Sequence, residues 1–213
     1  MKISLSDAGK RFNRDWIFRH LTFNFESNIS YAITGPNGSG KSTLLQLIAG
    51  ALEPSEGKVH WHSQEQEIEE AEVYKHISIC APYLELVEEM TALEFLRFHS
   101  RFKPFIQDGS HTDILNIVQL DKAGHKQIRY FSSGMKQRLK LAQAIFSNTP
   151  MLLLDEPCTN LDEAGYQLYY SLIDKYCSHR LVIVSSNEKL EYSFCKEVVD
   201  ITAFKTNLTQ QQL

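Results

Sequence analysis

The fold of this chain is decided by one glycine-rich stretch, Gly35-Pro36-Asn37-Gly38-Ser39-Gly40-Lys41-Ser42. The stretch follows the pattern G-x-x-x-x-G-K-[S/T] in full. A short apolar run, Tyr31-Ala32-Ile33, leads directly into it, as expected of a buried strand. After it, leucine and isoleucine recur at helical spacing as far as Gly50, where the C-terminal glycine of a helix belongs. The sequence therefore predicts a strand, a glycine-rich loop and a helix in succession.

A loop of this kind is suited to binding phosphate. Its glycines let the backbone curl so that successive N–H groups point at phosphate oxygens, and the helix adds the positive end of its dipole. Lys41 is expected to act as a catalytic cation on the β and γ phosphates, and the Ser42 hydroxyl to ligate Mg²⁺. We therefore expect ATP and Mg²⁺ as ligands. The expected nucleotide contacts are Gly35, Pro36, Asn37, Gly38, Ser39, Gly40, Lys41, Ser42 and Thr43.

A pair of acids follows a second apolar run, Met151 to Leu154. Ligands of open α/β sheets bind at the carboxyl ends of the strands, where Asp155 and Glu156 would emerge. Asp155 is the expected second ligand of Mg²⁺, and Glu156 is the expected base that polarises the attacking water. The alternative is an acidic loop that caps the next helix.

A third candidate site is the small-residue turn Ser132-Ser133-Gly134-Met135, which opens a helix expected from about Gly134 to Ser147. One of the serines could simply cap that helix. A helix N-terminus with free N–H groups and serine hydroxyls also binds phosphate. Both interpretations remain open at the level of the turn itself.

Residues 83–130 differ from the rest of the chain because their sequence signals are those of helices. Thr91 and Glu94 form a predicted capping box, and Phe95, Phe98 and Phe102 follow at helical spacing as an expected core stripe. We expect an all-helical subdomain here, inserted into a nucleotide-binding core formed by residues 1–82 and 131–213. Strands alternating with helices favour an α/β fold with a mostly parallel sheet, preceded by a strand-rich N-terminal region.

Composition narrows the class of protein. The chain has 213 residues, 43% of them hydrophobic, and a formal net charge of −4, which argues against general nucleic-acid binding. Apolar runs all fall short of the roughly 18 residues that a membrane helix needs, and the N-terminus lacks a signal-peptide core. We expect a cytoplasmic protein that acts at a membrane only through a partner. The tail Gln210-Gln211-Gln212 is expected to fray.

Together these segments resemble the ABC ATPase family, and the resemblance covers nearly the whole chain. The family order is phosphate loop, helical subdomain, signature turn, acidic strand and then Asp162 in Thr159-Asn160-Leu161-Asp162. The turn Ser132 to Met135 is a variant of the usual signature Ser-Gly-Gly-Gln. The resemblance implies a P-loop NTPase core with an antiparallel β region, and adds Asp162 to the nucleotide site. It also implies that Phe12 stacks on adenine; Trp16 is the rival, and a buried strand position is the alternative for Phe12.

The resemblance further implies a shared site between two copies of the chain. ATP on the phosphate loop of one copy is covered by the signature turn of the other, where Ser132 and Gly134 contact the γ-phosphate. Closure and hydrolysis drive a separate integral membrane subunit at the inner face of the cell membrane, touched by residues near Tyr83 to Met90. The alternatives are a nucleotide-gated switch with little or no hydrolysis, and a soluble non-transport ABC ATPase.

Two positions depart from the family pattern. The family has a glutamine where Pro82 stands here, and a histidine where Asn187 stands. Proline has no side-chain polar group, and asparagine donates only a neutral hydrogen bond. Asn187 is therefore expected to be a weakened catalytic contact. We expect that ATP still binds and is hydrolysed slowly.

Overall fold

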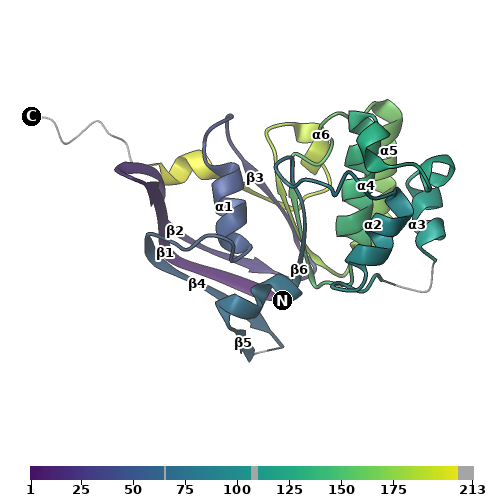
Figure 1. Ribbon diagram of the computed structural model, residues 1–213. Coiled ribbons are helices and arrows are strands. Elements are labelled where there is room, and N and C mark those ends of the chain that lie inside the picture. The colour runs from purple at the N-terminus through teal and green to yellow at the C-terminus, as the bar shows by residue number, and fades with distance from the viewer. Residues whose placement is uncertain (65, 107–109, 206–213) are drawn as a thin grey trace, which may run out of the picture.

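The computed structural model describes residues 1–64, 66–106 and 110–205, so the expected fraying of Gln210 to Gln212 lies outside the described residues (Figure 1). Two sheets organise the molecule. The first is antiparallel, has the order β2-β1-β4-β5, and confirms the N-terminal antiparallel region. Its strands are β1 (Lys2–Phe12), β2 (Asp15–Glu26), β4 (Glu56–Ser63) and β5 (Gln66–Ile68).

The second sheet is parallel throughout, with the order β6-β7-β8-β3-β9. Its strands are β6 (Ile77–Cys80), β7 (Met151–Asp155), β8 (Leu181–Ser185), β3 (Ser30–Thr34) and β9 (Glu197–Asp200). The expected mostly parallel sheet is confirmed. β9 ends at Asp200, and a 3₁₀ turn, η4 (Ile201–Phe204), follows it.

Both faces of the parallel sheet are covered, as the unbroken apolar runs of its central strands require. Leu153 of β7 packs into a core shared with helix α1 (Lys41–Ile48) and the antiparallel sheet, while Leu152 and Leu154 face a second core. That second core contains α4 (Ser133–Phe146) and α5 (Glu163–Tyr176). Figure 1 shows α1 between the two sheets and α4 and α5 beyond the parallel sheet.

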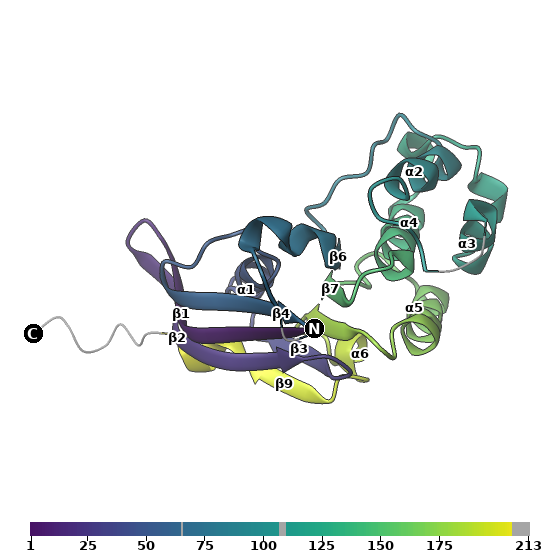
Figure 2. The ribbon, with the colours of Figure 1, turned by 90° about the horizontal axis from the view of Figure 1, so that it is seen from below.

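The inserted block carries α2 (Ala92–His99) and α3 (His111–Ile117), which pack on α4. Short 3₁₀ turns follow, η2 (Asp121–Ala123) and η3 (Ile128–Tyr130). Thr91 caps α2 and exchanges hydrogen bonds with Glu94 in both directions, so the capping box is confirmed. Both views place α2 and α3 at the end of the molecule remote from the β1–β2 hairpin (Figure 2). The boundaries of a subdomain at residues 83–130 stay a prediction.

The phenylalanine stripe is wrong as a prediction of core packing. Phe95 is buried, but the side chains of Phe98 and Phe102 are 42% and 71% exposed and pair with each other, ring centroids 5.1 Å apart. For Phe102 the reason is that α2 ends at His99. Helical periodicity does not extend to Phe102, which lies beyond the end of the helix.

The remaining short elements are η1 (Glu70–Lys75), between β5 and β6, and α6 (Lys189–Tyr192), between β8 and β9. The segment that enters α6 contains Asn187. It leaves β8 at the same edge of the sheet at which β7 ends, because Asp155 pairs with Ser185.

Candidate functional site

The register of the parallel sheet brings the predicted catalytic segments to one edge. Asp155 at the end of β7 lies opposite Ser185 at the end of β8, and Ser185 lies opposite Ile33 of β3. The glycine-rich loop begins directly after β3. This is the edge at which parallel sheets bind ligands.

The glycine-rich loop surrounds a cavity of about 230 Å³. Its lining residues are Ile17, Asn37, Gly38, Gly40, Lys41, Ser42, Thr43 and Glu156. The structure thus places Glu156 beside the loop, as expected of a catalytic base. Gly35, Pro36 and Ser39 belong to the same loop but do not line this cavity. Ile17 was missed by the sequence analysis, because nothing in β2 marks it except its proximity to Gly40 in the folded chain.

Lys41 is held inward at the start of α1. Its side chain is buried, and its Nζ atom donates to the carbonyl oxygens of Gly35 at 2.9 Å and Pro36 at 3.4 Å. These carbonyls satisfy the ammonium only as hydrogen-bond acceptors and carry no full negative charge. A phosphate anion in the cavity would supply that charge.

Buried polar atoms that lack a hydrogen-bond partner show whether the predicted metal-binding residues suit a metal ion. Asp155 is 2% exposed, and its Oδ1 atom has no hydrogen-bond partner among the described residues. Ser39 Oγ and Ser185 Oγ, also buried, share this property. An unpaired buried carboxylate oxygen is costly unless a ligand satisfies it. Carboxylate and hydroxyl oxygens suit Mg²⁺, so Asp155 and Ser42 are consistent with the predicted metal site.

Glu156 adopts an unusual backbone conformation. Its φ angle is +44°, in the left-handed region, which costs a residue with a side chain about 1–2 kcal/mol. Its backbone N–H donates to the Ser185 carbonyl at 2.9 Å. Residues held in such conformations concentrate at functional sites, where the surrounding structure determines the direction of the side chain.

The signature turn lines a different cavity, of about 350 Å³. The residues around it are Ser132, Ser133, Gly134, Met135, Arg138, Asn160, Leu161 and Asp162. The structure therefore brings Asp162 and the signature turn together, and it keeps both apart from the phosphate-loop cavity of the same chain.

Two residues that line this second cavity, Ser132 and Asp162, are also the N-caps of helices. Ser132 Oγ accepts from the Met135 backbone N–H at 3.2 Å, so the capping interpretation holds for Ser132. Asp162 caps α5 by accepting from Gly165 N at 2.9 Å, and Arg138 Nη2 approaches it at 3.3 Å. The Gly165 hydrogen bond, with a smaller contribution from Arg138, lowers the pKa of Asp162. Nucleotide contact by Ser132 and Asp162 stays a prediction.

The two aromatic candidates for adenine stacking differ in how free their rings are. Arg19 lies 4.2 Å from the centre of the Trp16 ring, and Arg11 lies 5.4 Å from it. Phe12, at the end of β1, is 48% exposed, with Lys10 Nζ 5.4 Å from its ring centre. Phe12 therefore has more free surface for a base, and the buried-strand alternative for it is wrong.

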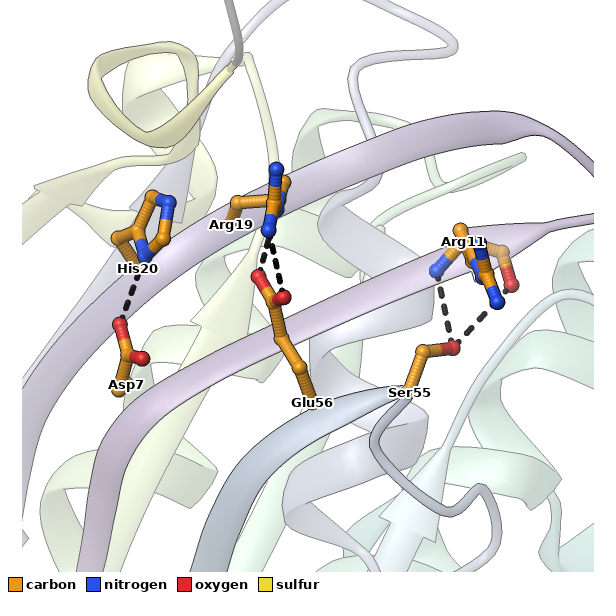
Figure 3. Close-up of polar contacts among 6 residues, drawn as sticks. All are labelled: Asp7, Arg11, Arg19, His20, Ser55 and Glu56. Carbon is orange, nitrogen blue, oxygen red and sulfur yellow. Dashed lines mark hydrogen bonds and ion pairs between the residues drawn. The ribbon is translucent and has the colours of Figure 1, made fainter.

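Polar contacts hold the strands that carry these aromatics (Figure 3). Arg19 of β2 reaches across β1 to Glu56 of β4, with Nε–Oε1 and Nη2–Oε2 distances of 2.6 and 2.7 Å. The backbone N–H of Arg11 donates to Ser55 Oγ at 3.2 Å, just before β4. These contacts fix the outer end of the antiparallel sheet next to the phosphate loop.

A further residue at the sheet edge was missed. Tyr83 directly follows Pro82, and burial raises the pKa of its phenol, with a smaller raising effect from the negative charge of Asp155 and an opposing hydrogen bond from Gln46 of α1. Tyr83 is 44% exposed, so its ring is only partly covered at this edge. Its place shortly after β6, at the carboxyl edge of the sheet, is the signal that could have identified it. Asn187 lies at the same edge, where its Nδ2 atom donates to Asn37 Oδ1 of the phosphate loop at 3.2 Å.

Comparison with known proteins agrees with this geometry. Residues 18–159 match the protein family described as ABC transporter. The uncharacterized ABC transporter ATP-binding protein YybJ of Bacillus subtilis is 29% identical, over 91% of this chain and 89% of that protein.

Solved structures share the fold. A candidate ABC transporter ATP-binding protein from Pyrococcus furiosus has a TM-score of 0.82 at 22% identity, covering 97% of this chain and 100% of that one. The dimeric structure of the bacterial ABC transporter cassette MJ0796 has a TM-score of 0.78 at 21% identity, covering 93% and 94%. Within the described part of the chain, none of the helices is long and apolar enough to span a membrane.

Proposed function

Because this chain belongs to the ABC transporter family of ATP-binding proteins, we propose that it binds and hydrolyses ATP between two copies of itself and thereby drives a separate membrane-embedded subunit. The observation that carries the proposal is the separation of two half-sites. The phosphate loop and Glu156 line one cavity, while the signature turn and Asp162 line another. Each half is incomplete alone, and two copies arranged head to tail would complete both.

In this arrangement Lys41 neutralises the phosphates, Glu156 polarises the attacking water, and Ser132 and Gly134 of the partner copy close over the γ-phosphate. Ser42 and Asp155 would hold Mg²⁺, which supplies positive charge to the phosphates when bound. Phe12 stacks on adenine at the outer end of the site. The fold match to a dimeric cassette supports this arrangement.

A substitution in the signature turn tests the shared site. A Cβ atom at Gly134 would lie 3.1 Å from the Asn160 carbonyl oxygen, so Gly134→Asp places both bulk and negative charge in the second cavity. We expect the variant to bind ATP as wild type does but to stay monomeric with a non-hydrolysable ATP analogue and Mg²⁺. Wild type should dimerise under the same conditions, as measured by light scattering. A dimeric Gly134→Asp variant would contradict the shared site.

The membrane-facing partner would contact the segment from Tyr83 to Met90, placing the chain at the inner face of the membrane. Leu84 and Val87 are 36% and 41% exposed there. Apolar side chains that are exposed close together on one segment are the kind of surface that a protein partner covers. Tagged chain isolated from detergent-solubilised membranes should carry an integral membrane protein with it. Recovery of the chain alone, or with ribosomes or DNA, would favour a non-transport ABC ATPase instead.

The turnover is expected to be slow, because the amide of Asn187 donates only a neutral hydrogen bond where a histidine would carry charge. We expect Asn187→His to raise turnover about five-fold, since a charge-assisted bond is worth about 1 kcal/mol more than a neutral one. Phosphate release in single-turnover conditions measures this. Unchanged or lower turnover would show that Asn187 is not a weakened contact. A wild type no faster than Glu156→Gln would favour the nucleotide-gated switch.

A further inference from the structure

Two carboxylates are buried among the described residues, Asp155 and Glu191. Asp155 belongs to the predicted metal site, whereas Glu191, on the short helix α6, is 3% exposed and has no role in the site described so far. Burial raises the pKa of Glu191, and the nearby charges of Glu188 and Glu156 act in the same direction. Hydrogen bonds from Ser186 and from the Cys158 backbone oppose this shift. A buried acid is tolerated only with such partners, so the partners indicate its role.

The partner of Glu191 lies in the turn that follows Glu156. The Glu191 Oε1 atom accepts a hydrogen bond from the Cys158 backbone N–H at 2.8 Å. From the other side, Gln137 Nε2 of α4 donates to the Pro157 carbonyl oxygen at 2.6 Å. Pro157 O and Cys158 N belong to one planar peptide group. Both polar atoms of that group are thus held by buried side chains from different parts of the chain.

This peptide group lies one residue after Glu156, whose φ angle is in the left-handed region. A strained residue keeps its conformation only when its neighbours are fixed. The Glu156 backbone has its own contacts: its N–H donates to the Ser185 carbonyl at 2.9 Å, and Thr159 donates to its carbonyl from N at 3.2 Å and from Oγ1 at 2.9 Å. None of these contacts holds the Pro157–Cys158 peptide group that follows. If the Pro157–Cys158 peptide group were released, the turn after Glu156 would lose its fixed end, and the Glu156 carboxylate would no longer be held toward the cavity.

We propose that Glu191 is a positioning residue for Glu156: together with Gln137 it clamps the Pro157–Cys158 peptide group and so directs the Glu156 carboxylate into the phosphate-loop cavity. The clamp also joins α4, whose first turn carries the signature residues, to the segment that carries Asn187. Both flanks of the shared site therefore act on the same catalytic turn. The inference rests on the proposed function, because it assumes that Glu156 acts on ATP.

The test compares Glu191→Ala with Glu191→Gln in the full chain, with or without the membrane subunit. We expect Glu191→Ala to lower kcat about 10- to 100-fold while KM for ATP changes less than about three-fold. Glutamine keeps an oxygen that accepts the Cys158 hydrogen bond, so Glu191→Gln should retain most of kcat. Glu197→Ala, which removes an exposed acid from the same region, serves as the matched control and should resemble wild type.

A double-variant cycle separates positioning from general damage. Gln137→Met removes the second half of the clamp, and its effect on kcat should not add to that of Glu191→Ala, because both release the same peptide group. Circular dichroism must show all variants folded. Three outcomes would overturn the proposal. In the first, Glu191→Ala and Glu197→Ala have equal kcat; in the second, both Glu191 variants change kcat and KM by similar factors. In the third, the effects of Glu191→Ala and Gln137→Met on kcat are fully additive.

A second measurement does not depend on turnover. In the nucleotide-free chain, hydrogen exchange of the Cys158 amide should be at least ten-fold faster in Glu191→Ala than in wild type, and near wild type in Glu191→Gln. Unchanged exchange overturns the clamp whatever the activity. If wild type itself does not exceed Glu156→Gln in turnover, the proposed hydrolysis fails, and the clamp is then judged by the exchange of this amide alone.

Discussion

Replacing Glu156 by glutamine is expected to slow ATP turnover by about 100- to 10,000-fold while ATP binding persists. The amide has the shape of the carboxylate but does not accept a proton from the attacking water. Glu156 lines the cavity that also contains Lys41 and Ser42, so it is the acid best placed for this role. Asp155 differs from it in being buried, with an Oδ1 atom that has no hydrogen-bond partner among the described residues.

This expectation is measured by phosphate release together with an ATP-binding titration. Glu163→Gln, an exposed acid in the first turn of α5, is the matched control and should turn over ATP as wild type does. Because hydrolysis no longer reopens the shared site, the Glu156→Gln protein should also accumulate as an ATP-bound dimer. Wild-type turnover in Glu156→Gln would remove Glu156 from the mechanism, and loss of ATP binding would assign it a binding role instead.

Replacing Gly40 by alanine is expected to abolish measurable ATP binding and to lower the free energy of unfolding by about 2–5 kcal/mol. The φ angle of Gly40 is +105°, a conformation that residues with a side chain rarely adopt. A Cβ atom there would also lie 2.2 Å from the Cγ2 atom of Ile17, far inside van der Waals contact. Both effects act at the N-terminus of α1, where the phosphate loop must keep its shape.

Two companion variants divide this effect into its parts. Gly38 has a φ angle of +73°, and a Cβ atom added there would have none of the described atoms within 4 Å. Gly38→Ala should therefore lose only the backbone contribution, about 1–2 kcal/mol. Ile17→Ala in the Gly40→Ala background should restore the stability lost to the steric clash and leave the backbone strain. Urea unfolding measures each step. If Ile17→Ala restores nothing, the contact between β2 and the loop is not what limits position 40.

Much of the site could be predicted from local sequence. The strand, loop and helix around Gly35 to Ser42 follow from short-range rules, because glycine conformations and helix capping depend on neighbouring residues. The continuous burial of β7 and the emergence of Asp155 and Glu156 at its end have the same origin. The capping box at Thr91 and Glu94 was likewise readable, since both partners lie within one helical turn.

Other features were decided only by the tertiary structure. Phe98 and Phe102 match a helical stripe, yet both are exposed. Phe102 lies beyond the end of α2 at His99, and Phe98, although inside α2, is left 42% exposed by the described elements around it. Ile17 and Glu191 belong to no sequence motif. The folded chain places Ile17 against Gly40, and it places Glu191 against the Cys158 backbone. Sequence patterns specify hydrogen bonds and periodicity within a few residues. Burial and contact between distant segments depend on the order in which strands pair. The glycine-rich loop was therefore evident from the chain alone, whereas the contacts of Ile17 and Glu191 were not.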